Sequence, residues 1–440
     1  MKKPLLNPLL LLLAVVLLQA CSNTGQRLEA PVQNAIEGPL RVEIRQQQDG
    51  WRLYRGGSLY YINGAGGSGY LDELAARGGN SVRTWSTNNA QEVLDEAHKR
   101  GLTVTLGLDV ARERHGFDYN DTAAVARQLE KLRIEVQKYK NHPALLIWGI
   151  GNELNLHYSN PKVWNAVNDI ARMIHEEDPN HPATTMLAGI NKAEVDLIKT
   201  QVPALDLLAV NAYGDLPAVP QKIRSLGWEK PYIITEWGPT GHWEVAKTAW
   251  GAPIEETSSQ KAAVYRLRYE ASMGLDTQMN LGSYVFLWGQ KQERTPTWYG
   301  LFTEAGEATE VVDVMQYLWT RSWPQNRAPQ LDSLRLDRKS ATDNISLAPG
   351  RSYTAAVYAR DPNGDALSYR WELLPESTDL KEGGDRESRP APLEGLFTAA
   401  ESGRISLTAP AQEGPYRLFV YVYDGSNKVA TANLPFYVQK

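Results

Sequence analysis

The sequence has few of the features that mark several common protein classes. Its 440 residues include one cysteine, Cys21, so no internal disulfide can form. Basic residues are not in excess. The formal net charge is −5, and charges of both signs are mixed along the chain, so there is no reason to expect a nucleic-acid partner. Phenylalanine is scarce, with 6 residues against 13 Trp and 21 Tyr. The amphipathic side chains of Trp and Tyr are favoured on surfaces that stack against sugars. Even so, we expect most of these side chains, taken one by one, to lie in the core.

A targeting segment opens the chain. Two lysines precede an uncharged apolar run, residues 9–18, which is too short for a comfortable membrane span. The run ends in Leu-Gln-Ala-Cys21, which resembles the lipobox of bacterial lipoproteins. We therefore expect residues 1–20 to be a lipoprotein signal peptide and Cys21 to be a lipid anchor to the membrane. Ser22 resembles the residue found in lipoproteins sorted to the outer membrane, so the expected location is the cell envelope of a Gram-negative bacterium.

Strand and helix patterns alternate after a polar tether at residues 21–38. A hairpin closed by Asp49-Gly50 is expected first. Amphipathic helical stretches then separate eight apolar runs that read as buried strands: 59–64, 81–85, 103–108, 145–150, 184–187, 207–211, 232–235 and 283–287. This number of strands and helices predicts an α/β fold, a (β/α)8 TIM barrel, over residues 39–322. A doubly wound sheet is the alternative, but Gly64-Ala-Gly-Gly-Ser-Gly69 lacks the spacing of a dinucleotide fingerprint.

The hydrophobic period changes to two after a linker at residues 323–331. Short alternating runs separated by turns predict a smaller all-β immunoglobulin-like sandwich over residues 332–440. Residues 376–395 are rich in Glu, Gly, Arg and Pro and are expected to form a mobile loop in it. Asp361, Asp365 and Asp424 could hold calcium between strands, but turn-forming aspartate is the commoner role. No metal and no cofactor are therefore predicted.

Two carboxylates dominate the barrel sequence. Glu153 and Glu236 each end an apolar run, after the fourth and the seventh strand candidate. An ionised Glu beside a buried strand is costly unless it has partners or a function. Side chains at the carboxyl ends of barrel strands converge on one face. Two such glutamates are typical of the acid/base and the nucleophile of a retaining glycosidase.

The motifs around both glutamates resemble those of the clan A retaining glycoside hydrolases. In that clan Asn precedes the acid/base, as in Asn152-Glu153, and an aromatic residue and Gly follow the nucleophile, as in Glu236-Trp237-Gly238. The resemblance covers roughly residues 40–320 and is closest to the family two catalytic barrel and related β-glycanases. It does not extend to the N-terminal sandwich domains of family two exo-enzymes, so endo or exo action stays open.

The resemblance implies roles for further residues. Arg83 and Tyr213 would donate hydrogen bonds to the nucleophile, and Asn152 would donate to the sugar 2-hydroxyl. Trp288 would offer a flat face beneath the sugar ring. Cleft walls are expected from a further group of rings, comprising Trp85, Trp237, Trp243 and Trp298. His157 and His242 could line the cleft, but a solvated loop position is the commoner one.

These patterns predict a lipid-anchored glycosidase that hydrolyses O-glycosyl bonds of a β-linked poly- or oligosaccharide. The alternatives are a β-glycan transglycosylase, a non-catalytic carbohydrate-binding lipoprotein, or a structural surface protein. The pair of glutamates favours an enzyme, because a binding protein does not need both. The sugar, the linkage and the oligomeric state are not specified by the sequence.

Overall fold

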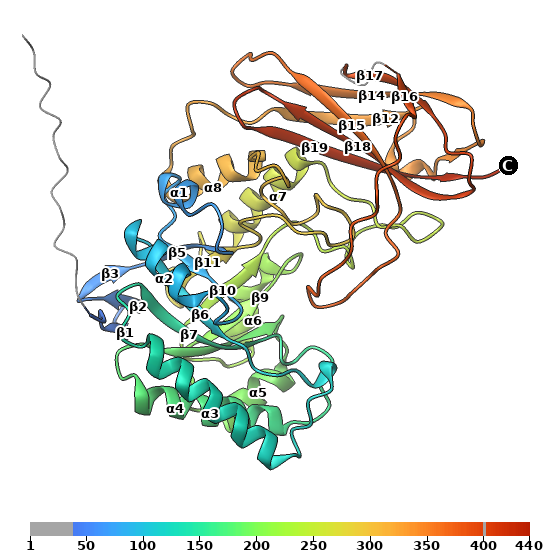
Figure 1. Cartoon of the computed structure of the whole chain (residues 1–440). Coiled ribbons are helices and arrows are strands. Elements are labelled where there is room, and N and C mark those ends of the chain that lie inside the picture. Colours follow the sequence, from blue (N-terminus) through green and yellow to red (C-terminus); the bar gives the residue numbers. More distant parts are fainter. Residues whose placement is uncertain (1–37, 399–401) are drawn as a thin grey trace, which may run out of the picture. The chain divides into compact units, whose positions relative to one another are not determined.

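The computed structural model describes residues 38–398 and 402–440 (Figure 1). The expected signal peptide and the lipid anchor Cys21 lie outside these residues, as does the tether except for Gly38. Among the described residues, no helix is long and apolar enough to cross a membrane.

An antiparallel sheet covers one end of the barrel. It consists of β1 (Val42–Gln47), β2 (Gly50–Arg55) and β3 (Ser58–Tyr60), and the expected Asp49-Gly50 turn joins the first two. Val42 and Leu53 pack on apolar residues near the starts of barrel strands, including Leu146 and Leu281. Because this sheet closes the amino-terminal end, a ligand site is left to the carboxyl ends of the strands.

Eight parallel strands form a closed barrel, which confirms the predicted fold class. Their buried positions explain why each reads as a continuous apolar run rather than an alternating one. In chain order the strands are β4 (Ile62–Gly66), β5 (Ser81–Arg83), β6 (Thr103–Leu108), β7 (Leu145–Asn152), β8 (Ala183–Ala188), β9 (Leu208–Asn211), β10 (Tyr232–Trp237) and β11 (Asn280–Val285). The predicted eighth strand was placed about three residues too late, because Asn280 and Gly282 hide its start.

Helices on the outside complete the barrel (Figure 1). Each turns an apolar stripe toward the strands; α4, for example, buries Trp164, Ile170 and Ile174. The helices are α1 (Leu71–Ala76), α2 (Ala90–Lys99), α3 (Thr122–Tyr139), α4 (Lys162–Glu177), α5 (Lys192–Gln201), α6 (Val219–Ser225), α7 (Ser258–Ala271) and α8 (Glu310–Thr320), with short 3-10 turns at Glu113–His115 and Leu216–Ala218.

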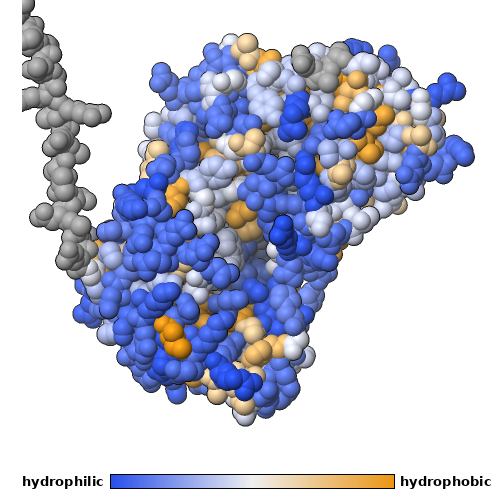
Figure 2. All heavy atoms as spheres, viewed as in Figure 1, coloured by the Kyte–Doolittle hydropathy of each residue, from blue (hydrophilic) through white to orange (hydrophobic). Residues whose placement is uncertain are grey.

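Two four-stranded sheets form the C-terminal domain and share one apolar core, as predicted. One sheet contains β12 (Gln330–Leu336), β14 (Ser352–Arg360), β17 (Arg404–Thr408) and β16 (Phe397–Thr398). The other contains β13 (Ser346–Leu347), β19 (Val429–Val438), β18 (Gly414–Tyr423) and β15 (Ser368–Pro375), and a 3-10 turn at Ala341–Asp343 precedes β13. On the face in Figure 2, hydrophilic residues predominate and apolar ones occur in small separate groups.

Buried polar contacts join this domain to the barrel. Lys428, just before β19, pairs with Asp313 of α8, and both side chains are buried. Glu255 receives hydrogen bonds from Lys261 of α7 and from Asn433 of β19, each at 2.5 Å. Moving the domain away would leave these buried charged groups without partners, which would cost free energy. The contacts therefore hold the C-terminal domain in place on the barrel.

One segment between β15 and β16 leaves the sheets and lies against the barrel loops. We call residues 381–387 the strap. Arg294 of the barrel donates its backbone N–H to Glu387 at 2.6 Å, and His157 pairs with Glu382 at 2.8 Å. The sequence indicated a mobile loop here because its composition is polar, but the partners of these charges are far away in the chain.

Candidate active site

A cavity of about 1010 Å³ lies at the carboxyl ends of the barrel strands. The loops that follow β5 to β11 line it, together with four residues of the strap, Glu382–Asp385. Glu153, Glu236 and Tyr213 are among its lining residues, so the structure brings these predicted site residues together in one cavity.

Glu236 accepts three side-chain hydrogen bonds. Arg83 and Trp85 donate to its Oε1 at 2.7 and 2.8 Å, and the Tyr213 hydroxyl donates to Oε2 at 3.1 Å. Arg83 is fully buried at the end of β5 and Glu236 lies in β10, so the salt bridge crosses the barrel interior. These three donors, one of them a cation, hold both carboxylate oxygens of Glu236 in place.

Glu153 has a different environment. It directly follows β7 and has a left-handed backbone with φ of 52°, which is uncommon for a residue with a side chain. Its Oε1 accepts one hydrogen bond, from Nδ2 of Asn211 at 2.9 Å. Burial, and then the charge of Glu236, raise the pKa of Glu153 to about 7. The two carboxyl groups therefore have different surroundings in the same cavity.

Asn152 links the surroundings of both glutamates. Its Oδ1 accepts from Arg83 at 2.6 Å and from Asn211 at 3.2 Å. Asn211 is in turn oriented by the Thr235 hydroxyl, which donates to its Oδ1 at 2.8 Å. With Oδ1 held by two donors, the Asn152 amide is fixed so that Nδ2 is left to donate to a ligand.

The predicted aromatic residues divide into two groups. Trp85 and Trp243 line the cavity, and 55% of the Trp243 surface is exposed. Trp237, Trp288 and Trp298 are buried and do not line it. The placement of Trp288 as a face beneath the sugar needs correction, since its indole N–H donates to the Tyr70 carbonyl and its ring packs on Phe302.

Trp237 needs the same correction. Its side chain points away from the cavity and packs on Tyr265 and Tyr269 of α7. Side chains alternate along a strand, so the residue next to Glu236 faces the helices when Glu236 faces the interior. His157 and His242 both line the cavity; His157 binds the strap, and His242 lies 3.5 Å from Glu293.

Sequence reasoning missed several charged or polar residues of the cavity, among them Asn211, Arg112 and Glu293. Asn211 donates to Glu153, and Arg112 donates to the Asn152 carbonyl at 3.1 Å. Glu293, in the loop after β11, is a further buried carboxylate; burial opposes its ionisation, but His242 and Lys291 lower its pKa overall. Asn211 could have been found, because a polar residue that ends a buried strand resembles the signal given by Glu153. Glu293 lies far from any strand and gave no such signal.

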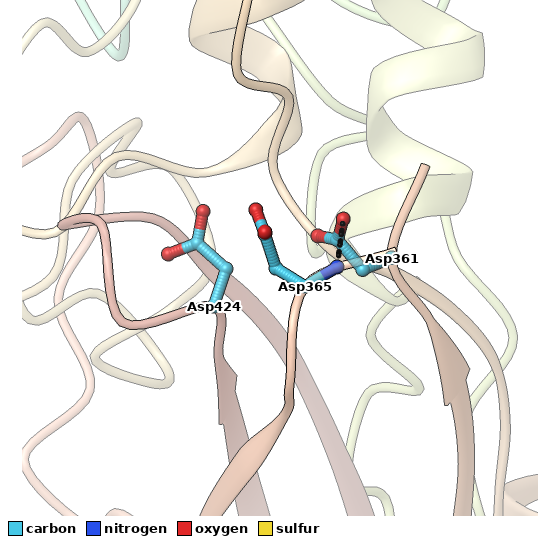
Figure 3. A group of neighbouring side chains, drawn as sticks. All are labelled: Asp361, Asp365 and Asp424. Carbon is cyan, nitrogen blue, oxygen red and sulfur yellow. Dashed lines mark hydrogen bonds between the residues drawn. The ribbon is translucent and has the colours of Figure 1, made fainter. Parts of the chain in front are cut away.

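The C-terminal domain contains the group of carboxylates best suited to hold a metal within the described ranges. Oxygens of Asp361, Asp365 and Asp424 lie within 4.8 Å of one another (Figure 3). Asp361 Oδ1 accepts backbone N–H groups of Asn363 and Asp365 at 2.7 and 3.1 Å. Asp424 Oδ1 accepts from Ser426 at 2.7 Å. These contacts are those of turn-forming aspartates.

Several solved structures resemble this chain. They include a β-glucuronidase of Faecalibacterium prausnitzii, with a TM-score of 0.51, 18% identity and coverage of 64% of this chain and 52% of that one. A β-D-glucuronidase of Dictyoglomus thermophilum has a TM-score of 0.50, 18% identity and coverage of 64% and 54%. Bacteroides uniformis β-glucuronidase 2, covalently bound to cyclophellitol-6-carboxylate aziridine, has a TM-score of 0.50 and 14% identity. The match covers 90% of this chain and 48% of that one.

At these identities the likeness shows a shared fold, and this chain spans about half the length of the structures that it matches. The sequence itself gives the more specific match. Residues 77–244 hold β5 to β10 and both glutamates of the cavity, and they match the family model of glycosyl hydrolases family 2, TIM barrel domain.

Proposed function

We propose that the protein is a retaining glycoside hydrolase that cleaves O-glycosidic bonds of a β-linked glycan. Glu236 is the nucleophile and Glu153 the acid/base. The observation that carries the proposal is the unequal environment of the two carboxyl groups in one cavity. Glu236 has a buried arginine and two further donors, whereas Glu153 has one amide donor and a pKa of about 7.

In the first step the Glu236 carboxylate attacks the anomeric carbon while protonated Glu153 gives its proton to the glycosidic oxygen. The bond between the anomeric carbon and that oxygen breaks, the leaving group departs as an alcohol, and a glycosyl ester forms on Glu236. Arg83 and Tyr213 donate hydrogen bonds to the Glu236 carboxylate and orient it for this attack.

In the second step a water molecule attacks the same carbon. Ionised Glu153 accepts its proton, the ester bond breaks, and Glu236 returns as a carboxylate. Two inversions give a product with the original anomeric configuration. The Nδ2 group of Asn152 is placed to donate to a sugar hydroxyl, an interaction that strengthens as charge develops in the transition state.

The two glutamates predict different failures. Glu236→Ala removes the nucleophile and should abolish turnover of every substrate. Glu153→Ala should lower turnover of natural glycans by about 10²–10⁴-fold, because it removes general acid–base help. An aryl glycoside with an acidic leaving group needs no proton, so it should still form the glycosyl ester with Glu153→Ala. Azide should then rescue this variant and give the β-azide.

Proton NMR of the first-formed products measures the outcome, on a panel of aryl β-glucosides, β-galactosides and β-glucuronides. With Glu236→Ala, azide can attack only from the opposite face and should give the α-azide. Glu270→Ala, which changes an exposed carboxylate on α7, is the matched control and should keep wild-type turnover. Inversion by the wild type, or azides of swapped configuration, would overturn the assignment.

We further propose that lipidated Cys21 anchors the protein in the cell envelope, at the outer membrane. The support is the signal-like segment that ends in Leu-Gln-Ala-Cys21. Wild-type protein should fractionate with membranes, and Cys21→Ser should release it. Equal partitioning of the two forms between the membrane and soluble fractions would refute the anchor.

A further inference from the structure

The strap bridges two parts of the barrel rim. On one side it binds the loop after β11, the eighth barrel strand. Lys291 donates to the Gly384 carbonyl at 2.9 Å, and Arg294 donates to Glu387 through its backbone and to the Lys381 carbonyl through its side chain, at 2.6 and 3.1 Å. Glu387 is buried, so this end of the strap is firmly held.

On the other side the strap binds the loops after β6 and β7, the third and fourth strands. His115 pairs with Asp385 at 3.0 Å, and His157 pairs with Glu382 at 2.8 Å. Arg114 connects the strap to the catalytic region, because it donates to the Gly383 carbonyl at 3.4 Å and to the Glu153 carbonyl at 3.3 Å.

The loops of the barrel are short above β4 and β5, between the two sides that the strap connects. The connections after the first two strands are short, residues 67–70 and 84–89, whereas those after the seventh and eighth strands run over residues 238–257 and 286–309. The long loops line the cavity on one side. The strap joins the loop after β11 to the loops after β6 and β7. It therefore spans the low side of the rim, the part above β4 and β5 where the barrel's own loops are short.

Gly383 fits closely between barrel residues. A Cβ added there would lie 2.6 Å from Nη2 of Arg114 and 3.0 Å from Leu156, and its φ of 62° already disfavours a side chain. Gly395 belongs to the same connection and has a φ of 75°, but a Cβ there would meet nothing within 4 Å. A substitution at either glycine strains the backbone, but only one at Gly383 also adds a contact with the barrel. Comparing the two substitutions therefore distinguishes the effect of the contact from the effect of the strain.

We propose that the strap is the substrate-size filter of the cavity: it walls off the low side of the rim and limits the length of glycan that can bind. The proposal rests on the proposed function. The C-terminal domain is then part of the substrate site, since it supplies Glu382–Asp385 as lining residues. An open groove on that side would admit a longer chain, whereas a strap held by two His–carboxylate pairs and Arg294 stops it.

The test compares kcat and KM on β-linked oligosaccharides, from disaccharide to hexasaccharide, and on the best aryl β-glycoside. Gly383→Val should push the strap off Arg114, and Gly395→Val is its matched control. The double variant Glu382→Ala/Asp385→Ala releases the strap without adding bulk. In both released forms kcat/KM for the hexasaccharide, relative to the disaccharide, should rise at least about tenfold, mainly through KM. With Gly395→Val, which lies outside the cavity lining, turnover of the aryl glycoside should stay within about threefold of wild type.

Gly395→Val should keep the wild-type ratio. If the wild type turns over the aryl glycoside and the length ratio is the same in all variants, the strap proposal is wrong and the proposed function stands. A hexasaccharide that the wild type already cleaves as well as the disaccharide would also refute the strap proposal. If the wild type turns over no glycoside, the proposed function fails, and the size filter fails with it.

Discussion

The two glutamates of the cavity have the same residue type but different neighbours. Both are carboxylates at the ends of barrel strands, yet one binds Arg83, Trp85 and Tyr213 and the other binds Asn211 alone. Burial of Glu153 raises its pKa and favours the neutral form, whereas Glu236 lies beside a cation and two further hydrogen-bond donors. In the proposed function this difference divides the roles: Glu236 is the nucleophile and Glu153 is the acid/base.

The raised pKa of Glu153 predicts a pH-dependent stability. Its pKa rises from 4.5 to about 7, first through burial and then through the charge of Glu236. Between these values the unfolded chain has lost the proton that the folded protein keeps, so folding stability falls as pH rises through this range. Glu153→Gln has no proton to lose. Relative to wild type, it should gain at most about 3 kcal/mol of stability between pH values below about 4 and above about 8.

Urea unfolding of both proteins at the two pH values measures this gain. Glu270→Gln is the control, since this exposed side chain should give no pH-dependent difference from wild type. A stability difference between Glu153→Gln and wild type that does not change with pH would contradict the raised pKa.

At the scale of elements, the sequence predicted what depends on short-range pattern. Apolar runs gave the eight strands and their order, and strand counting placed Glu153 and Glu236 at the ends of the fourth and the seventh. This worked because parallel barrel strands are buried on both faces, so hydrophobicity alone marks them. The turn at Asp49-Gly50 was predicted for a similarly local reason.

Other features depend on direction or on distant contacts. Trp237 and Trp288 lie near the predicted strand ends, but proximity to a strand end does not specify whether a ring faces the cavity or the helices. The strap contacts the barrel through Arg114, His157 and Arg294, which are far from it in sequence. A polar segment is expected to be exposed only when no distant residue binds its charged groups. A single sequence does not show which distant residues do so.

At the scale of the whole molecule, the barrel and the C-terminal domain share a buried ionic interface. Asp313 is fully buried on α8, pairs with Lys428 and also accepts the Ala328 backbone N–H at 2.7 Å. Arg417 of β18 donates to the Pro253 carbonyl at 2.9 Å. The interface therefore holds the domain that carries the strap in one orientation.

Removing one partner of the buried pair should be costly. Lys428→Met leaves the charge of Asp313 without its cation and should lower the free energy of unfolding by about 3–5 kcal/mol. Adding Asp313→Asn removes the stranded charge but keeps an acceptor for Ala328, so the double variant should recover much of the loss. Denaturant unfolding of the single and double variants measures the coupling. Strictly additive effects would show that the pair does not support the interface.

The origin of the strap also has a consequence for timing. A ribosome makes Glu153 and Glu236 long before residues 381–387, and β18 and β19, which brace the same domain, come later still. On the proposal above, the low side of the rim stays open until β18 and β19 have been made and the domain that carries the strap has folded. If the strap is the size filter, the protein gains this selectivity only after residues as far as Val438 have been made.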